Sequence, residues 1–352
     1  MVNNKKINIL LLLLILAISL AACTSSKKSN ELTLVKNEQM VLGTFGQISA
    51  YSSSEKEGNE IISKVFDRIS EIENLMSTSI DGSDVYNMNK NAGIEPVKIN
   101  SSTLDVLEKG LEYFSITKET FNIGLGSLID LWGIGKDWQK VPTQEEILNA
   151  RKHIDLSQLE VSEENHTAFV KDSEMMLDLG GIAKGYAVDE SVRILRENGI
   201  KSGIVNLGGD IYALGSKTDG SLWRIGIDNP EIGADNSIAR ISISDKSVVT
   251  SGDYERYFIE DDVRYHHIID PATGYPADSG LVSVTIVSDK AMDGDVLSTS
   301  VFVLGIEEGL KLIESRDGVE GILVTKDRKV YVSSGLKNQV EILDDNFVIE
   351  NN

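Results

Sequence analysis

Two short segments carry residue types that bind phosphate and a hard cation. In the first, Asp178–Asp189 (DLGGIAKGYAVD), two glycines precede a predicted helix whose first turn carries Lys184. Glycines let a ligand approach the backbone, and the first turn of a helix has unpaired N–H groups, so this segment can hold an anion. Taken alone, the same residues fit an ordinary strand-to-helix turn with a surface lysine.

The second segment places a carboxylate and a hydroxyl on one helix face. Asp295 and Thr299 stand four residues apart at the start of a predicted helix, so their oxygens lie about one turn apart. Such a pair, completed by water and phosphate oxygens, is a usual set of ligands for Mg²⁺. The alternative makes Asp295 a helix N-cap and Thr299 a packing residue.

Two adjacent histidines, His266 and His267, from a total of four in the chain, lie in a predicted strand, Tyr265–Asp270, that runs into a turn. Side chains alternate along a strand, so one histidine faces inward, and we expect it to be His267. An imidazole there can accept a proton or bind a phosphate, although a hydrogen-bonded core histidine fits equally well. The segment Thr250–Tyr254 adds hydroxyl groups and a glycine in another loop.

Hydrophobic spacing predicts the elements that must position these side chains. A strand, a tight glycine turn and a second stretch of strand are expected over Gln39–Tyr51, and Phe121–Gly135 is expected to be an ordered loop. Helices are predicted at Glu57–Met76, Ser102–Ser115, Gly181–Asn198 and Asp295–Leu304. Short strands are predicted at Ser202–Asn206, Trp223–Ile227, Ile238–Ser242, Leu281–Val287, Gly321–Thr325 and Val330–Val332. Strands and helices that do not alternate strictly indicate an α+β fold with mixed or antiparallel sheets.

The amino-terminal residues predict export. Lys5 and Lys6 precede an apolar run, Ile9–Ile18, that is shorter than the roughly 20 residues of a membrane span, so residues 1–22 are expected to be a signal peptide. Cys23 follows, and as the only cysteine it excludes an internal disulfide. Residues 23–37 are expected to form a flexible tether, and residues 38–348 one domain or two closely packed lobes, because no linker divides them.

The charge of the chain limits its partners. Lys and Arg number 34 against 55 Asp and Glu, which gives a net charge of −21. Such a surface repels nucleic acid and anionic lipid headgroups. A phosphate can therefore enter only where backbone amides, a lysine or a metal ion reverse the local field.

The order of these motifs resembles the ApbE family of FAD:protein FMN transferases, from about Met40 to beyond Gly305. In addition, Leu20-Ala21-Ala22-Cys23 resembles the lipobox of bacterial lipoproteins, in which the cysteine is lipidated. The motifs that carry the family resemblance are Met40 with Gly43-Thr44, Phe121–Gly135, DLGGIAKGYAVD, NLGGDI at Asn206–Ile211, TSGDYER at Thr250–Arg256, HIIDPATGYP at His267–Pro276 and DVLST at Asp295–Thr299.

The resemblance implies a two-lobed single unit, similar to a T-fold, that binds FAD and Mg²⁺. Members move FMN from FAD to a Thr or Ser hydroxyl of an extracytoplasmic acceptor protein and release AMP. The positions that match metal ligands in the family are Gly181, Asp295, Ser298 and Thr299, and those that match catalytic residues are His267, Asp295 and Lys184. Positions expected to contact FAD are Met40, Ser79, Asn89, Thr120, Phe121, Asn122, Asp178, Lys184, Ser251, Gly252, His267 and Ile268.

The chain departs from the family pattern at several FAD positions. Ser79 stands where an aromatic residue is common, Asn122 and Gly124 replace Asp and Thr, and Leu42 replaces a second Met. None of these changes removes a predicted metal ligand. Hydrolysis of FAD to FMN and AMP, capture of FAD without turnover, and a purely structural surface lipoprotein are the alternatives to flavin transfer. By its resemblances, the protein is expected on the extracytoplasmic side of the cell membrane, anchored through lipid on Cys23.

Overall fold

The computed structural model describes residues 32–231 and 233–350. The predicted signal peptide, Cys23 and the tether up to residue 31 lie outside these residues. Within them, no helix is both long enough and apolar enough to span a membrane. The first strand already begins at Thr33, so residues 33–37 of the predicted tether belong to the folded body.

A nine-stranded sheet forms the centre of the described structure, in the order β1-β2-β6-β7-β10-β13-β14-β15-β17. Neighbouring strands pair antiparallel except β15 and β17. The strands are β1 (Thr33–Val41), β2 (Thr44–Ser52), β6 (Gly203–Leu207), β7 (Asp210–Leu214), β10 (Lys246–Gly252), β13 (Leu281–Ser288), β14 (Glu320–Thr325), β15 (Lys329–Val332) and β17 (Val348–Ile349).

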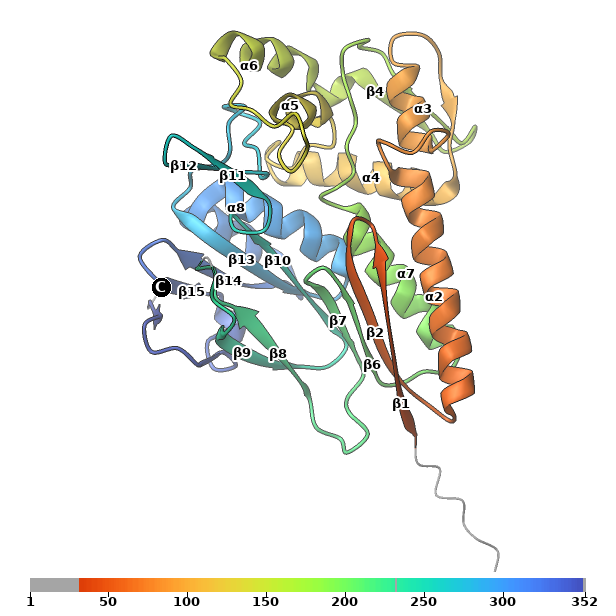
Figure 1. Cartoon of the computed structure of the whole chain (residues 1–352), viewed down its shortest axis with the longest axis vertical. Coiled ribbons are helices and arrows are strands. Elements are labelled where there is room, and N and C mark those ends of the chain that lie inside the picture. The colour runs from red at the N-terminus through yellow and green to blue at the C-terminus, as the bar shows by residue number, and fades with distance from the viewer. Residues whose placement is uncertain (1–31, 232, 351–352) are drawn as a thin grey trace, which may run out of the picture.

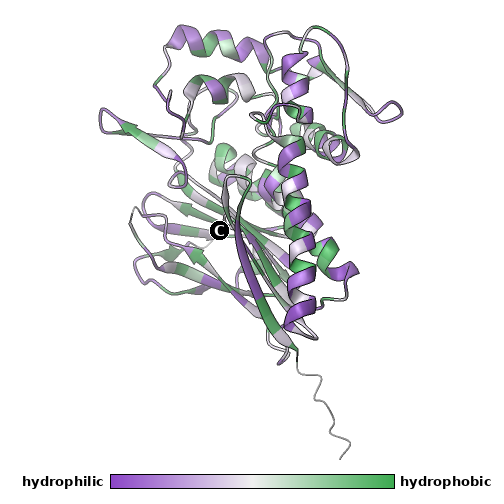
Figure 2. Cartoon of the chain, turned by 45° about the vertical axis from the view of Figure 1, so that its right-hand side comes forward, coloured by the Kyte–Doolittle hydropathy of each residue, from purple (hydrophilic) through white to green (hydrophobic). Residues whose placement is uncertain are grey.

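Three helices pack against one face of this sheet: α2 (Glu55–Met76), α7 (Ala183–Glu197) and α8 (Ala291–Glu314). Figure 1 shows α2 and α7 side by side along one side of the molecule. Hydrophilic and hydrophobic segments alternate along α2 in Figure 2, as expected of a helix that buries one face. That face, from Ile61 to Met76, joins the larger apolar core together with Val249 and Val284 of the sheet.

The other face of the sheet encloses a second core. A three-stranded sheet of β8 (Trp223–Asp228), β9 (Ser237–Ile243) and β16 (Glu341–Ile342) packs there. Because side chains alternate along a strand, Val248 points into this second core while its neighbour Val249 joins the larger one. The nine-stranded sheet therefore separates two hydrophobic layers.

A mainly helical part lies at one end of the molecule, at the top of Figure 1. It contains α3 (Asp84–Lys90), α4 (Ser101–Ile116), α5 (Gly126–Trp132), α6 (Gln144–Ala150) and the short strands β3 (Val97–Lys98), β4 (Leu159–Ser162) and β5 (Thr167–Val170). A separate hairpin, β11 (Tyr257–Glu260) and β12 (Val263–His266), packs Phe258 and Tyr265 against α5.

The predicted α+β class with antiparallel sheets is confirmed, and three local predictions are corrected. The expected loop Phe121–Gly135 contains helix α5, which Gly133 ends in the left-handed conformation. Helix α8 begins at Ala291, four residues before the predicted start, because the carboxylate of Asp189 caps its first N–H groups. The strand predicted at Tyr265–Asp270 ends at His266.

Candidate active site

The first turn of α7 lies beside α8 and the start of β7. Lys184 Nζ lies 2.5 Å from Asp210 Oδ1 and 3.9 Å from Asp295 Oδ1. The lysine side chain is 18% exposed, and the two carboxylates are 0% and 6% exposed. Burial lowers the pKa of Lys184, but the two carboxylates more than reverse this and raise it above its usual value. Lys184, at the start of α7, is therefore protonated and positively charged.

The backbone around Lys184 keeps part of the predicted anion-binding capacity. Asp178 accepts a hydrogen bond from the N–H of Gly180 at 2.7 Å, and Asp295 accepts one from Gly185 at 2.9 Å. The N–H groups of Gly181 and Lys184 have no partner among the described residues. Two amides and one ammonium group can thus face a phosphate here.

Thr299, one helical turn after Asp295 on α8, lies close to the backbone of Gly181. A Cβ built on Gly181 would lie 3.9 Å from Thr299 Oγ1, so this backbone and this hydroxyl are close. One oxygen of Asp295 bonds Gly185, which leaves Oδ1 for another ligand. Ser298 is fully buried and donates to the Asp295 carbonyl oxygen at 3.0 Å, with Ser251 Oγ at 2.8 Å. Ser298 and Ser251 therefore lie behind Thr299 and support it.

These groups fit a magnesium ion. No set of three His, Cys, Asp or Glu side chains that could hold a metal ion is found in residues 32–231 and 233–350. Mg²⁺ does not need such a set, because it accepts one or two carboxylates with hydroxyl, carbonyl, water and phosphate oxygens. Asp295 Oδ1 and Thr299 Oγ1, from the second and third turns of α8, and the carbonyl of Gly181, just before α7, can supply that donor type.

The histidine that faces the core is His266, so the expectation that His267 would be the inward one is wrong. His266 is 6% exposed, packs on Phe302 and contacts the Ala277 carbonyl oxygen at 3.0 Å through Nε2. His267 follows the end of β12 and is half-buried, with Nδ1 3.3 Å from the Arg256 carbonyl oxygen. Burial, and then the charge of Arg256, lower the pKa of His267 to about 3, so its imidazole is neutral at ordinary pH.

Two further charged residues join the site from the segment between β10 and β11. Glu255 lies near enough to Lys184 and Asp295 for their charges to interact, and burial raises its pKa. Arg256 interacts electrostatically with Asp178, Glu255 and His267. The sequence motif TSGDYER was predicted to lie in the site, but no role was predicted for Glu255 or Arg256. Two adjacent charged residues directly after Gly252-Asp253-Tyr254 could have indicated that they contribute charge to the site.

The loop before α5 places Phe121 beside Gly181. A Cβ on Gly181 would lie 3.2 Å from Phe121 Cε2, so this glycine leaves room for the ring. The amide of Asn122 bonds the Ile154 carbonyl oxygen at 2.9 Å and the Gly124 N–H at 2.7 Å, and Thr120 Oγ1 bonds the Thr117 carbonyl oxygen at 2.8 Å. The polar groups of Thr120 and Asn122 thus hold the loop in place.

Ser79 and Asn89 lie in the helical part, at or beside a pocket of about 520 Å³. Asn89 lines it, and Ser79 is exposed next to Thr78, which also lines it. The side-chain amide of Asn89 donates to the carbonyl oxygen of Leu177 at 2.9 Å and accepts the N–H of Leu177 at 2.7 Å, directly before Asp178. Asn89, which lines the pocket, is therefore hydrogen-bonded to the residue that directly precedes the Asp178–Lys184 segment.

Met40 and Ile268 are the remaining predicted contacts. Met40 is 72% exposed near the tip of the β1–β2 hairpin, whose Phe45 carbonyl oxygen accepts the N–H of Gly208. Ile268 is buried, so it can offer a ligand only its backbone. The hairpin tip thus adjoins the turn before Asp210, which brings Met40 toward the site.

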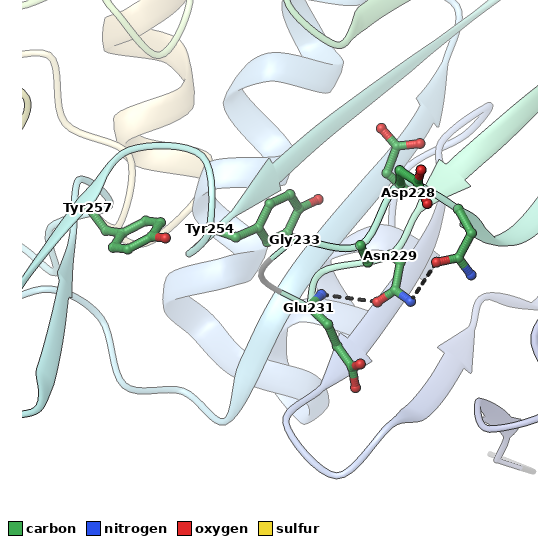
Figure 3. Close-up of a pocket in the computed structure, with 9 residues that line it drawn as sticks. Asp228, Asn229, Glu231, Gly233, Tyr254 and Tyr257 are labelled. Carbon is green, nitrogen blue, oxygen red and sulfur yellow. Dashed lines mark hydrogen bonds between the residues drawn. The ribbon is translucent and has the colours of Figure 1, made fainter.

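A second pocket of about 320 Å³ contains none of the predicted site residues. Figure 3 shows Tyr254 and Tyr257 on one side of it and the Asp228–Asn229 turn on the other. Asn229 fixes that turn through bonds to Glu231 N and Asn236, at 3.0 and 3.1 Å. One of its lining residues, Tyr254, follows the predicted FAD contact Gly252 by two residues in the chain.

Comparison with known proteins supports the sequence resemblance. Residues 42–323 match the model of the ApbE family. The chain is 35% identical over 326 residues to the FAD:protein FMN transferase of Treponema pallidum, covering 89% of this chain and 90% of that protein. It is 34% identical over 311 residues to one from Klebsiella pneumoniae, covering 88% and 95%.

Solved structures have the same fold. The ApbE protein of Thermotoga maritima superposes with a TM-score of 0.80 at 32% identity, covering 87% of this chain and 98% of that one. The flavin transferase ApbE of Vibrio cholerae gives 0.78 at 30% identity, covering 88% and 99%. Sequence, fold and the order of the site motifs agree, and the chain belongs to the ApbE family.

Proposed function

We propose that this protein transfers FMN from FAD to a Thr or Ser hydroxyl of an extracytoplasmic acceptor protein, through a Mg²⁺-dependent reaction that releases AMP. The observation that carries the proposal is the proximity of Lys184 and the Gly181 backbone, at the start of α7, to Asp295 and Thr299 in the second and third turns of α8. Family membership and the names of the relatives support flavin transfer between FAD and a protein.

In the proposed reaction, the acceptor hydroxyl oxygen attacks the FMN-side phosphorus. A new phosphoester P–O bond forms, the anhydride P–O bond breaks, and AMP leaves with the bonding electron pair. Mg²⁺ held by Asp295, Thr299 and the Gly181 carbonyl would neutralise charge on the phosphoryl oxygens. Lys184 adds a fixed positive charge, and the free N–H groups of the α7 start face the same region.

The proton of the hydroxyl needs an acceptor. His267 Nδ1 faces a carbonyl oxygen at 3.3 Å and therefore carries the hydrogen in that contact, which leaves the lone pair of Nε2 free. We propose this nitrogen as the base, with the carboxylate of Glu255 as the alternative. Asp178, Phe121 and the pocket beside Asn89 are proposed to hold the rest of the dinucleotide.

A mass measurement tests the reaction. Full-length protein in detergent, FAD, Mg²⁺ and an acceptor protein should give an acceptor heavier by one FMN phosphoester and an equal amount of AMP. Asp295→Ala should abolish the adduct, whereas Asp293→Asn, two residues earlier on α8, should retain it. An unchanged adduct yield with Asp295→Ala removes this carboxylate from the reaction.

The same assay separates the competing functions. Free FMN with AMP and no adduct would indicate FAD hydrolysis, in which water replaces the acceptor hydroxyl. Binding of FAD without Mg²⁺ and without turnover would indicate a solute-binding lipoprotein. Removal of Mg²⁺ with a chelator should stop FMN transfer, and added Mg²⁺ should restore it.

We also propose that the protein is anchored on the extracytoplasmic side of the membrane through lipid on Cys23. This proposal rests on the apolar run before Cys23 and the small residues Ala21-Ala22. Labelling cells with a radioactive fatty acid tests it. The unaltered protein should carry the label, and Cys23→Ala should not.

A further inference from the structure

We infer that Asp210 is a positioning residue that draws the ammonium group of Lys184 away from Asp295 and so leaves Asp295 free to bind a divalent cation. The inference rests on the proposed function, because it assigns a task to a residue behind the proposed cation site. It starts from two unequal distances: Lys184 Nζ lies 2.5 Å from Asp210 Oδ1 but 3.9 Å from Asp295 Oδ1.

The backbone fixes the position of Asp210 beside Lys184. Gly208 and Gly209, with φ of 58° and 96°, form the two-residue turn between β6 and β7, and Asp210 pairs with Leu207 directly after it. The side chain of Asn206 accepts the N–H of Gly209 at 3.0 Å. A Cβ on Gly208 would collide with Thr44, so the turn is also held by the β1–β2 hairpin. Asp210 is thus the first residue of a strand whose start is fixed from both sides.

The contacts of Asp210 do not indicate that this residue is present to stabilise the fold. Its side chain is fully buried, and Oδ2 has no hydrogen-bond partner among the described residues. An unpartnered buried carboxylate oxygen destabilises a fold. The charges of Asp210, Asp295 and Glu255 all act on the single ammonium group of Lys184, and burial, together with repulsion from Asp295, raises the pKa of Asp210. A carboxylate kept at this cost in stability indicates a functional task.

The task follows from the geometry of Lys184. Its ammonium group can pair closely with only one of the two carboxylates while it also faces a phosphate. If Asp210 lost its charge, the nearest carboxylate would be that of Asp295, and Lys184 would move toward Oδ1. This is the oxygen that Gly185 leaves free for a cation. A cation would then compete with an ammonium group for the same oxygen.

Binding of Mn²⁺, measured by electron paramagnetic resonance on the full-length protein with FAD present, tests the inference. Asp210→Asn should weaken Mn²⁺ binding by about tenfold. Lys184→Met should bind Mn²⁺ at least as tightly as the unaltered protein. The double variant Asp210→Asn with Lys184→Met should return to within about threefold of the unaltered protein, because no ammonium group remains to compete.

Two controls separate positioning from folding. Glu190→Gln, on α7 like Lys184, breaks an ion pair with Arg68 of α2 and should leave Mn²⁺ binding unchanged. Asp210→Asn should still fold, because the ammonium group of Lys184 keeps the carboxylate of Asp295 as a partner, and a melting curve checks this. If that variant does not fold, Asp210→Ser serves in its place.

The inference is overturned if Asp210→Asn binds Mn²⁺ normally, or if the double variant stays as weak as Asp210→Asn alone. The second result would mean that Asp210 acts independently of Lys184. Failure of the proposed function would look different: the unaltered protein would transfer no FMN, while the four Mn²⁺ affinities could still follow the expected order.

Discussion

Asp189 and Asp295 each accept hydrogen bonds from the first turn of the helix that carries the other. Asp189, on α7, accepts the N–H groups of Ala291 and Met292 at 2.8 and 3.1 Å, and Asp295, on α8, accepts that of Gly185 at 2.9 Å. Each carboxylate thereby satisfies donors that the helix itself leaves unpaired. This reciprocal capping locks the two helix starts together and sets the position of Asp295 relative to Lys184.

Gly185→Ala should disrupt this junction. An added Cβ would lie 2.5 Å from the Ala291 carbonyl oxygen and 2.6 Å from Met292 Cα, and neither backbone can move alone. We expect a loss of stability of about 1–3 kcal/mol, as for overpacking of a core, and a strong loss of FMN transfer. Chemical denaturation and the adduct assay measure the two effects.

Gly309→Ala on α8 is the matched control for Gly185→Ala. Its Cβ would meet a methyl group of Val301, at 2.7 Å, instead of the backbone of another helix. A smaller loss of stability is expected, since alanine also favours a helix over glycine by up to about 1 kcal/mol. Equal losses for the two variants would show that the α7–α8 junction is not specially constrained.

Asp189 should make the protein less stable as the pH rises from about 4 to 6. Burial, opposed by its two backbone hydrogen bonds, raises the pKa of Asp189 from 3.8 to about 6. Between these values the folded state binds more protons than the unfolded state, so the free energy of unfolding falls with rising pH, by at most about 3 kcal/mol. Denaturation at several pH values should show this fall, and Asp189→Asn should remove it. An unchanged slope in the variant would assign the pH dependence to another group.

His267→Gln should lower the rate of FMN transfer by about 10²–10⁴, the usual contribution of a general base. The fall in rate should persist at saturating FAD, because the loss falls on the chemical step and not only on the expected contact with FAD. Since the pKa of His267 is lowered to about 3, the unaltered protein should show no fall in rate near pH 6.5 from protonation of this imidazole. His153→Gln, at a partly buried histidine beside Asp172, is the control and should be fully active. A variant at His267 with unaltered rate would favour Glu255 as the base.

Ser79→Tyr should tighten FAD binding. Ser79 is exposed next to Thr78 at the rim of the 520 Å³ pocket, where an aromatic ring can stack on a ring of the dinucleotide. A stacked aromatic pair adds about 0.5–1.5 kcal/mol, which corresponds to a twofold to tenfold lower dissociation constant. Fluorescence quenching of the flavin measures it, with Ser79→Leu to separate stacking from simple apolar contact. Equal affinity for Ser79→Tyr and the unaltered protein would place the rings of FAD elsewhere.

Local periodicity predicted the long helices and most strands, because their apolar faces pack against the sheet over several turns. It missed α5, since the four glycines of Phe121–Gly135 hide a helix of seven residues, in which Gly126 permits close approach to Met176. The hairpin β11–β12 was also missed, because each strand has only four residues and its contacts to Trp132 are distant in sequence.

The site was predicted where residues of one motif act together, as with Asp295 and Thr299. Asp210 was missed as a partner of Lys184, since 26 residues separate them and only the β6–β7 turn brings them together. The choice between His266 and His267 failed for a related reason. Strand alternation ends at His266, so it gave no information about the direction of the next side chain.

The nine-stranded sheet divides the protein into two layers with different freedom to evolve. The α7–α8 junction and the proposed cation ligands lie on the face with the larger core, whereas β8, β9 and β16 pack on the opposite face. Substitutions in that opposite layer can alter solubility or partner contacts without moving Lys184 or Asp295. Relatives that share about a third of their residues with this chain are therefore expected to have diverged most in the β8–β9–β16 layer, and transplanting that layer between them should preserve catalysis.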